Sequence, residues 1–189
     1  EGCDDGVQLD CLSLADALAS GVDGPQVRAE AERILRKACR KDSAEACTRL
    51  GRLHIERQAK RPSVKKAAVL FEEACAAGSM EGCFHQAWML YNSIGVDRIS
   101  EEEKRDVKTD DGDDSSLDPV VVDNRKLVSL FRESCKGGYA PACDQMGDLF
   151  RLGDRVPPTP RQAAEFYGLA CDKGFSESCL HLGRLYESG

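Results

Sequence analysis

The chain has 189 residues and a formal net charge of −7, with 41% hydrophobic and 31% charged residues. A chain of this size and composition folds as one ordinary domain or as a short repeat array with a continuous core. It has no run close to the roughly 18 consecutive apolar residues of a membrane-spanning helix, so we expect no direct membrane insertion.

Ten cysteines form five pairs, and the two members of every pair are eight positions apart. The pairs, in chain order, are Cys3/Cys11, Cys39/Cys47, Cys75/Cys83, Cys135/Cys143 and Cys171/Cys179. Successive pairs begin 36, 36, 60 and 36 residues apart, so the longer step leaves room for an insertion of 24 residues in the third unit. A constant period of this length predicts repeated units. We expect a single domain over residues 1–189, with units starting near residues 3, 39, 75, 135 and 171.

Helices are predicted on both sides of each cysteine pair. In chain order, the segments 45–56, 63–75, 142–152 and 160–171 have the helical pattern. A large apolar residue lies four positions before the first cysteine of a pair (Leu35, Phe71, Phe131, Tyr167), and Ala31, Ala67, Leu127 and Ala163 lie eight before it. A small residue lies four positions after the second cysteine (Ala15, Gly51, Ala87, Gly147, Gly183). Apolar side chains at i, i+4 and i+8 form one helix face, and small residues let helices approach closely.

The stretch GGYAPACDQMGDLFRLGDRVPPTPRQAAEFYGLACDKG closely resembles a Sel-one-like repeat, a relative of the tetratricopeptide repeat. LGRLHIE, MGDLFRLG and LGRLYESG are similar to its Leu-Gly-x-Leu-Tyr-x-x-Gly element. The resemblance implies an all-α fold, a right-handed α-solenoid of antiparallel helix pairs with repeats of about 36 residues. The paired cysteines resemble the cysteine-rich subfamily found among secreted bacterial proteins. The first repeat, CLSLADALASGVDG, is degenerate.

Both ends of the chain cut through a repeat. The chain starts at Glu1 rather than Met and has no signal-peptide pattern, so we expect a removed leader or a fragment. Because solenoids need polar caps, we expect further chain or a partner over at least one end.

We interpret the paired cysteines as structural disulfides. A pair eight apart spans the turn between antiparallel helices, which brings its Cα atoms near the roughly 5.5 Å that a disulfide requires. Each closure of about nine residues contributes about 2.5 kcal/mol by loop entropy. Zinc sites space their cysteines two to four residues apart, and free thiols would leave the pairing unexplained. We expect no metal and an oxidising compartment: secreted or periplasmic, with the mitochondrial intermembrane space as the alternative.

Residues 97–123 form an acidic insertion with eleven acids and four bases, a net charge of −7 that equals the charge of the whole chain. Such a segment is a solvated loop, an electrostatic contact for a basic partner, or a divalent-ion site. Its DDGDD sequence does not match the spaced EF-hand loop. Val120, Val121 and Val122 either pack onto the solenoid or begin the next helix. An acidic segment on a neutral body argues against nucleic acid as a partner.

In the related tetratricopeptide repeats, the helix that carries the small residue lines a concave groove. Carried over by register, the resemblance implies these groove positions: Thr48, Arg52, Ile55; Phe84, Trp88, Tyr91; Asp144, Asp148, Arg151; Leu180, Arg184, Glu187. Phe84, Trp88 and Tyr91 form one aromatic stripe at i, i+4 and i+7. These rings either pack against a neighbouring helix or the insertion, or anchor a partner. Arg52, Asp144, Asp148 and Arg184 would add charge complementarity.

The sequence does not favour an enzyme. Ser63 and Lys66 satisfy Ser-x-x-Lys, a motif of penicillin-recognising enzymes, but the companion Ser-Asp-Asn and Lys-Thr-Gly elements are absent, and Ser63 follows Pro62 where a helix starts. His54 lies at a core helix position, and His85 and His181 each follow a cysteine by two positions. We therefore expect no catalytic residue and no cofactor.

The predicted function is to bind a protein or peptide in the groove, on its own or within a larger complex. The alternatives are an assembly factor or accessory subunit of the mitochondrial intermembrane space and, more distantly, a protein that binds or hydrolyses β-lactams.

Overall fold

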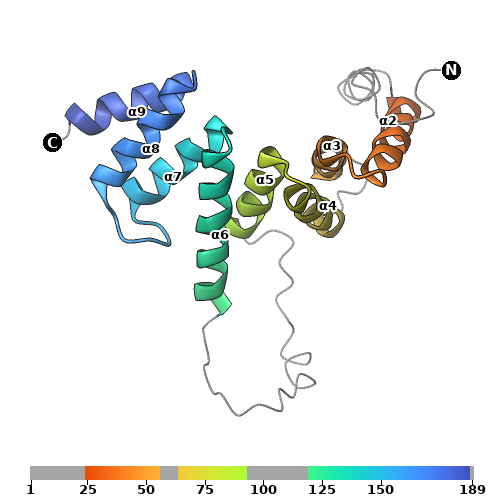
Figure 1. Ribbon diagram of the computed structural model, residues 1–189, viewed down its shortest axis with the longest axis horizontal. Helices are drawn as coiled ribbons and strands as arrows, with labels where there is room; N and C mark the ends of the chain where they lie inside the picture. Colours follow the sequence, from red (N-terminus) through yellow and green to blue (C-terminus); the bar gives the residue numbers. More distant parts are fainter. Residues whose placement is uncertain (1–23, 56–63, 93–118, 188–189) are drawn as a thin grey trace, which may run out of the picture.

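The structure is a computed structural model that describes residues 24–55, 64–92 and 119–187 (Figure 1). These residues form helices and no strands. The helices are α2 (Gly24–Cys39), α3 (Ala44–Ile55), α4 (Val64–Ala76), α5 (Met80–Tyr91), α6 (Pro119–Lys136), α7 (Ala140–Leu152), α8 (Pro160–Asp172) and α9 (Ser176–Glu187). The helices predicted over 45–56, 63–75, 142–152 and 160–171 are confirmed to within two residues at each end. Within these residues no helix is long and apolar enough to cross a membrane.

The helices stack in chain order from one end of the molecule to the other (Figure 1). Each helix packs against the next one in sequence, and α3 also contacts α5, the corresponding helix of the following unit. Packing restricted to neighbouring units is the defining property of a solenoid. The predicted all-α solenoid of antiparallel helix pairs is therefore confirmed.

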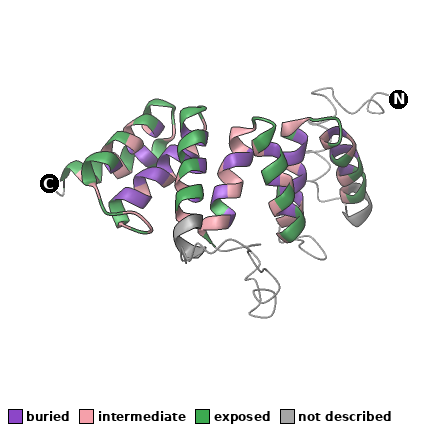
Figure 2. Cartoon of the chain, turned by 60° about the horizontal axis from the view of Figure 1, so that its bottom comes forward, coloured by how far each residue is buried: buried purple, intermediate pink, exposed green. Residues whose placement is uncertain are grey.

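The core is built from the apolar positions that repeat in the sequence. Leu35, Phe71, Phe131 and Tyr167 are at most 1% exposed. Ala31, Ala67, Leu127 and Ala163, four residues earlier on the same helix faces, are fully buried. Figure 2 shows the buried residues on the faces that the helices turn toward one another. The predicted core positions are therefore confirmed.

Close helix contact explains the small residue of each unit. A Cβ on Gly51 would lie 2.6 Å from Cε1 of Phe71, and a Cβ on Gly147 would lie 2.5 Å from the ring of Tyr167. Ala87 is fully buried at the same position of the third unit. A Cβ on Gly183 would meet no atom within 4 Å, because no described helix packs on that face of α9. Glycine in α3 and α7 therefore leaves room for the aromatic ring of the following helix.

Four of the five predicted disulfides are present: Cys39–Cys47, Cys75–Cys83, Cys135–Cys143 and Cys171–Cys179. Their Cα–Cα distances lie between 4.5 and 4.8 Å. Each disulfide joins the end of one helix to the start of the next, across the turn of a helix pair. The pairing of cysteines eight residues apart is confirmed for these four, and Cys3–Cys11 lies outside the described residues.

The turn between the two disulfide-bonded cysteines has the same geometry in each unit. The third residue after the first cysteine takes a left-handed conformation, with φ of 92° at Gly78, 100° at Gly138 and 84° at Gly174. The second unit has Asp42 at this position, with φ of 62°. In all four turns the N–H of this residue donates a hydrogen bond to the carbonyl of the cysteine three positions earlier. Glycine suits this position because it has no Cβ to clash in the left-handed region.

Helix α6 includes the last residues of the predicted acidic insertion. It begins at Pro119, so residues 119–123 are helical and do not belong to a loop. Of the two alternatives for Val120, Val121 and Val122, the start of the next helix is therefore correct. Proline fits the first helical position because its nitrogen has no hydrogen to leave unpaired there. The remainder of the insertion, residues 97–118, lies outside the described residues.

Candidate partner-binding surface

The helices that carry the small residue, α3, α5, α7 and α9, bear the predicted partner-binding residues. The position directly after the second cysteine contacts the start of the next such helix. Thr48 Oγ1 lies 2.8 Å from Oγ of Ser79, the N-cap residue of α5. The ring of Phe84 lies 5.1 Å from that of Tyr139, the N-cap residue of α7. These side chains join one unit to the next.

In the fourth unit, Asp144 takes this linking role. Asp144 is 5% exposed, and its carboxylate accepts a hydrogen bond from the hydroxyl of Ser178 in α9 at 2.5 Å. His181 Nδ1 lies 3.2 Å from the same oxygen. In α9 the equivalent residue, Leu180, is 64% exposed. Asp144 therefore faces the neighbouring helix α9, where it binds two of this chain's own side chains.

The position five residues after the second cysteine remains accessible on all four helices. We call this set the surface row: Arg52, Trp88, Asp148 and Arg184. Trp88 is 37% exposed, which is unusual for the largest apolar side chain, and Arg184 is exposed. The side chain of Arg52 is 51% exposed and donates to Glu81 of α5 at 3.1 Å. The surface row therefore presents two cations, one indole ring and one carboxylate at the same register.

The three residues of the aromatic stripe differ in their surroundings. Phe84 is half-buried, with its ring centroid 5.7 Å from that of Phe131. The hydroxyl of Tyr91 donates to Asp154 at 2.7 Å, and this bond raises the pKa of Tyr91. Phe84 and Tyr91 therefore contact neighbouring elements, as the packing alternative expects, whereas Trp88 remains accessible to solvent.

Asp148 belongs to a network with the two residues around it. The hydroxyl of Tyr167 donates to Asp148 Oδ1 at 2.7 Å, and Arg151 Nη2 donates to the same atom at 2.8 Å. Arg151 Nε also donates to the hydroxyl oxygen of Tyr167 at 2.9 Å. Burial, together with the bond to Asp148, raises the pKa of Tyr167 well above its usual range. The hydroxyl therefore keeps its proton and holds Asp148 in place.

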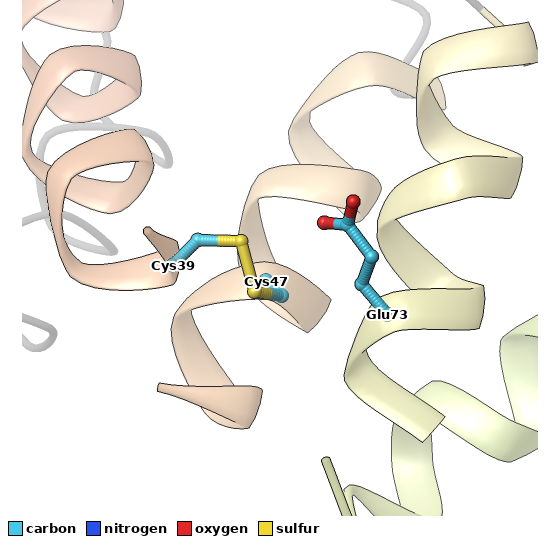
Figure 3. Close-up of side chains that lie close together, drawn as sticks. All are labelled: Cys39, Cys47 and Glu73. Carbon is cyan, nitrogen blue, oxygen red and sulfur yellow. A yellow bond between two sulfur atoms is a disulfide. The ribbon is translucent and has the colours of Figure 1, made fainter. Parts of the chain in front are cut away.

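Two groups of side chains in the described part of the chain bring potential metal-ligating atoms within 4.8 Å of one another. In the first group, Asp144, Asp148 and His181, the carboxylates already bind Ser178, Tyr167 and the cation Arg151. The second group is Cys39, Cys47 and Glu73 (Figure 3). Its two sulfur atoms form a disulfide, so neither can supply the thiolate that a metal requires. Hydrogen bonds and an ion pair account for the closeness of the first group, and a disulfide accounts for that of the two cysteines in the second.

The three histidines are half-buried side chains that pack within the helical core or against its aromatic rings. His54 is half-buried, and burial lowers its pKa. His85 stacks on Phe71 with ring centroids 4.8 Å apart, and His181 contacts the ring of Tyr167 edge-on at 5.1 Å. Ser178 is fully buried and donates to Asp144, so its hydroxyl is not placed as a nucleophile beside His181. Ser63 lies outside the described residues.

Sequence reasoning missed Arg155, which lies in the connection between α7 and α8. Its guanidinium donates to the carbonyl of Tyr91 at 2.7 Å and to Oδ1 of Asn124 at 3.1 Å. It also lies 5.4 Å from the centroid of the Tyr91 ring. Arg155 thus joins the end of α5 to the first part of α6, on either side of the acidic insertion. No repeated position marks it in the sequence, because only the third unit has an insertion.

A family model described as Sel1 repeat matches residues 11–43, 44–79 and 140–175 of the chain. The chain is similar in structure to a Sel1 repeat protein from Oxalobacter formigenes, with a TM-score of 0.72 and 14% identity. That match covers all of this chain and 65% of the other, so the chain spans less than two thirds of that protein. A comparison with curated proteins found no match.

Two further structures match with TM-scores below 0.5. The protective antigen c5321 of uropathogenic Escherichia coli, which has the SLR fold, matches with a TM-score of 0.44 and 19% identity over 97% of this chain and 42% of its own. A putative Sel1 repeat protein from Klebsiella pneumoniae matches with a TM-score of 0.38 and 22% identity over 93% of this chain and 91% of its own.

Proposed function

Because this chain belongs to the Sel1 repeat family, we propose that it is a scaffold that binds a protein or peptide across the helices α3, α5, α7 and α9. Repeat proteins of this kind present one extended face, built from equivalent positions of successive units, and they use it for binding. The distant catalytic alternative rests on Ser63, which lies outside the described residues. Within the described part of the chain, Ser178 is bonded to an acid that also contacts a histidine, but it is fully buried.

The observation that carries this proposal is the surface row. Arg52, Trp88 and Asp148 occupy the same register on successive small-residue helices and keep access to solvent. An exposed tryptophan between charged neighbours is the usual composition of an interface anchor with its electrostatic rim. Asp148 is pre-oriented by Tyr167 and Arg151, so little side-chain entropy is lost when a partner's cation binds it.

Affinity capture from periplasmic and culture extracts tests this role. The immobilised full chain is compared with Trp88→Ala and with Leu169→Ala, which removes a 47% exposed apolar side chain on α8, outside the surface row. We expect the wild type and Leu169→Ala to retain the same partner protein. We expect Trp88→Ala to bind it at least tenfold more weakly, a loss of roughly 1.4 kcal/mol in binding free energy. Equal retention by all three proteins would refute the role of the surface row.

For the compartment, we propose secretion or the periplasm. The four disulfides require an oxidising environment, which supports this location and equally the alternative of an intermembrane-space assembly factor. Fractionation of source cells with a thiol-alkylating reagent present from lysis onward separates the two. Recovery of the oxidised protein in the periplasm or medium supports the proposal, and recovery only with mitochondria replaces it with the alternative.

A further inference from the structure

The charges of the chain are strongly segregated along the solenoid. Residues 28–66 contain 13 of the 26 Lys and Arg residues but only 5 of the 33 Asp and Glu residues. This segment therefore carries a net charge of +8, whereas the whole chain carries −7. The residues outside the acidic insertion sum to zero net charge, so this total does not reveal the basic section. The section runs from α2 to the first turn of α4.

Two adjacent pockets lie on this basic section. The first, of about 590 Å³, is formed by α2, α3 and α4, and its lining includes Arg36, Arg40, Lys66, Leu50, Val69 and Leu70. The second, of about 520 Å³, lies along α2 and shares Arg36 and Arg40 with the first. Arg36 and Arg40 are one helical turn apart on the same side of the chain. Because both residues line both pockets, they lie where the two pockets meet. The pockets therefore form one continuous surface, which we call the basic pocket surface.

Cations dominate the lining of this surface. Seven Lys or Arg residues line the two pockets, against two carboxylates, Glu32 and Glu73. Glu32 forms an ion pair with Arg36, and Glu73 lies beside the Cys39–Cys47 disulfide (Figure 3). Arg40 and Lys66 are both exposed. An excess of this size focuses a positive potential into the concave surface and favours an anionic ligand.

The first pocket also offers apolar surface. Val69 is 54% exposed, and Leu70 is partly exposed beside it on α4. A volume of about 590 Å³ is in the usual range for a ligand-binding cleft of roughly 300 to 1,000 Å³. A ligand that fills the pocket therefore needs both negative charge and an apolar group.

We propose that the basic pocket surface binds an acidic segment of a partner polypeptide. An apolar side chain of that segment packs against Val69 and Leu70, and its carboxylates bind Arg36, Arg40 and Lys66. Single-stranded nucleic acid fits less well, because it is held by stacking on aromatic rings, and His54 is the only ring among the lining residues.

This surface is distinct from the surface row. Its residues lie mainly on α2 and α4, whereas the surface row lies on α3, α5, α7 and α9. The two surfaces can therefore hold different partners, or two segments of one partner. Failure of the acidic-segment proposal would leave the proposed scaffold function standing.

The test uses the full oxidised chain and a fluorescent peptide, EELEDLEE, with QQLQNLQQ as its neutral counterpart. The variant is Arg40→Glu with Lys66→Glu. Its matched control is Lys136→Glu with Lys126→Glu, which reverses two exposed charges at corresponding positions. Lys136, like Arg40, directly follows the first cysteine of a pair, and Lys126, like Lys66, lies nine residues before one. Circular dichroism and intact mass confirm the folded, oxidised state of both variants.

We expect fluorescence anisotropy to show salt-dependent binding of EELEDLEE by the wild type and the matched control, and at least tenfold weaker binding by the Arg40/Lys66 variant. We expect Val69→Ser to weaken binding severalfold without changing its salt dependence. Absence of binding, equal loss in both charge variants, or equal binding of QQLQNLQQ would overturn the proposal. Tighter binding of a single-stranded oligonucleotide or of phosphatidylglycerol vesicles, lost in the Arg40/Lys66 variant, would overturn the polypeptide as the partner class.

Discussion

The ring of Tyr167 occupies the place that a side chain on Gly147 would take, at 2.5 Å from the position of its Cβ. The same relationship joins Phe71 to Gly51 two units earlier, at 2.6 Å. A repeated contact of this closeness sets the distance between consecutive helix pairs. It also identifies the substitutions to which the solenoid is most sensitive.

Gly147→Ala is expected to destabilise the protein by about 1–2 kcal/mol, because overpacking against the buried Tyr167 ring outweighs the gain in helix propensity. Gly183→Ala is the matched control: it occupies the same register, but its Cβ meets nothing within 4 Å. It is expected to stabilise α9 by up to about 1 kcal/mol. Urea unfolding with the disulfides intact measures both changes. A Gly147→Ala protein as stable as the wild type would show that the helices can separate at no cost.

Gly78→Ala tests the left-handed turn without a steric complication, because a Cβ on Gly78 meets no atom within 4 Å and its φ is 92°. The expected loss is about 1–2 kcal/mol, from backbone strain alone. Gly168→Ala provides the comparison: Gly168 lies inside α8, and its Cβ also meets nothing within 4 Å. There alanine is expected to add up to about 1 kcal/mol. The left-handed conformation of Gly78 would be contradicted if thermal unfolding showed Tm shifting in the same direction for both variants.

Replacing Cys135 and Cys143 together by serine is expected to lower the free energy of unfolding by about 2.5 kcal/mol, since the closed loop has about nine residues. The effect acts mainly by restoring freedom to the unfolded chain, so the far-ultraviolet circular dichroism of the folded variant should match the wild type. Mass spectrometry after alkylation without reductant checks the starting state. Labelling of either cysteine in the wild-type protein would contradict the disulfide.

Tyr167→Phe is expected to alter the pH dependence of stability. The folded pKa of Tyr167 is raised, so above the unfolded value near 10 the unfolded state releases the proton first and stability falls as pH rises. Phenylalanine removes this contribution to the alkaline loss, and it costs about 1 kcal/mol at neutral pH through the lost bond to Asp148. Urea midpoints at pH 7 and between pH 10 and 11 measure both effects. Tyr186→Phe, at a 73% exposed ring, is the control. Parallel pH profiles for Tyr167→Phe and the wild type would refute this account.

Much of the fold could be predicted from the sequence, because its causes are local. The apolar side chains at Ala163 and Tyr167 lie on one helix face by the geometry of the helix itself. The eight-residue cysteine spacing spans a single turn, so Cys135 and Cys143 meet whatever the rest of the chain does. The end of the acidic insertion was the exception, since Pro119 begins a helix within a segment chosen by charge alone.

The candidate site was predictable only as a set of helix positions. Register placed Thr48, Asp144 and Trp88 on the small-residue helices without showing which of them face solvent. The stacking of units decided this: Thr48 meets Ser79 and Asp144 meets Ser178, residues 31 and 34 positions away. It also left Trp88 exposed and brought Arg155 to Tyr91 across the insertion.

The sequence by itself therefore determined the helix pairs, their disulfides and the core face of each helix, because these depend on residues within one unit. The tertiary structure alone decided which repeated positions link the units and which remain open. It also brought the charges of α2 and α4 together around a shared pocket. Those outcomes depend on which side chains of neighbouring units meet. Pairs such as Thr48 with Ser79 and Asp144 with Ser178 lie more than thirty residues apart, and their residue types do not recur from unit to unit.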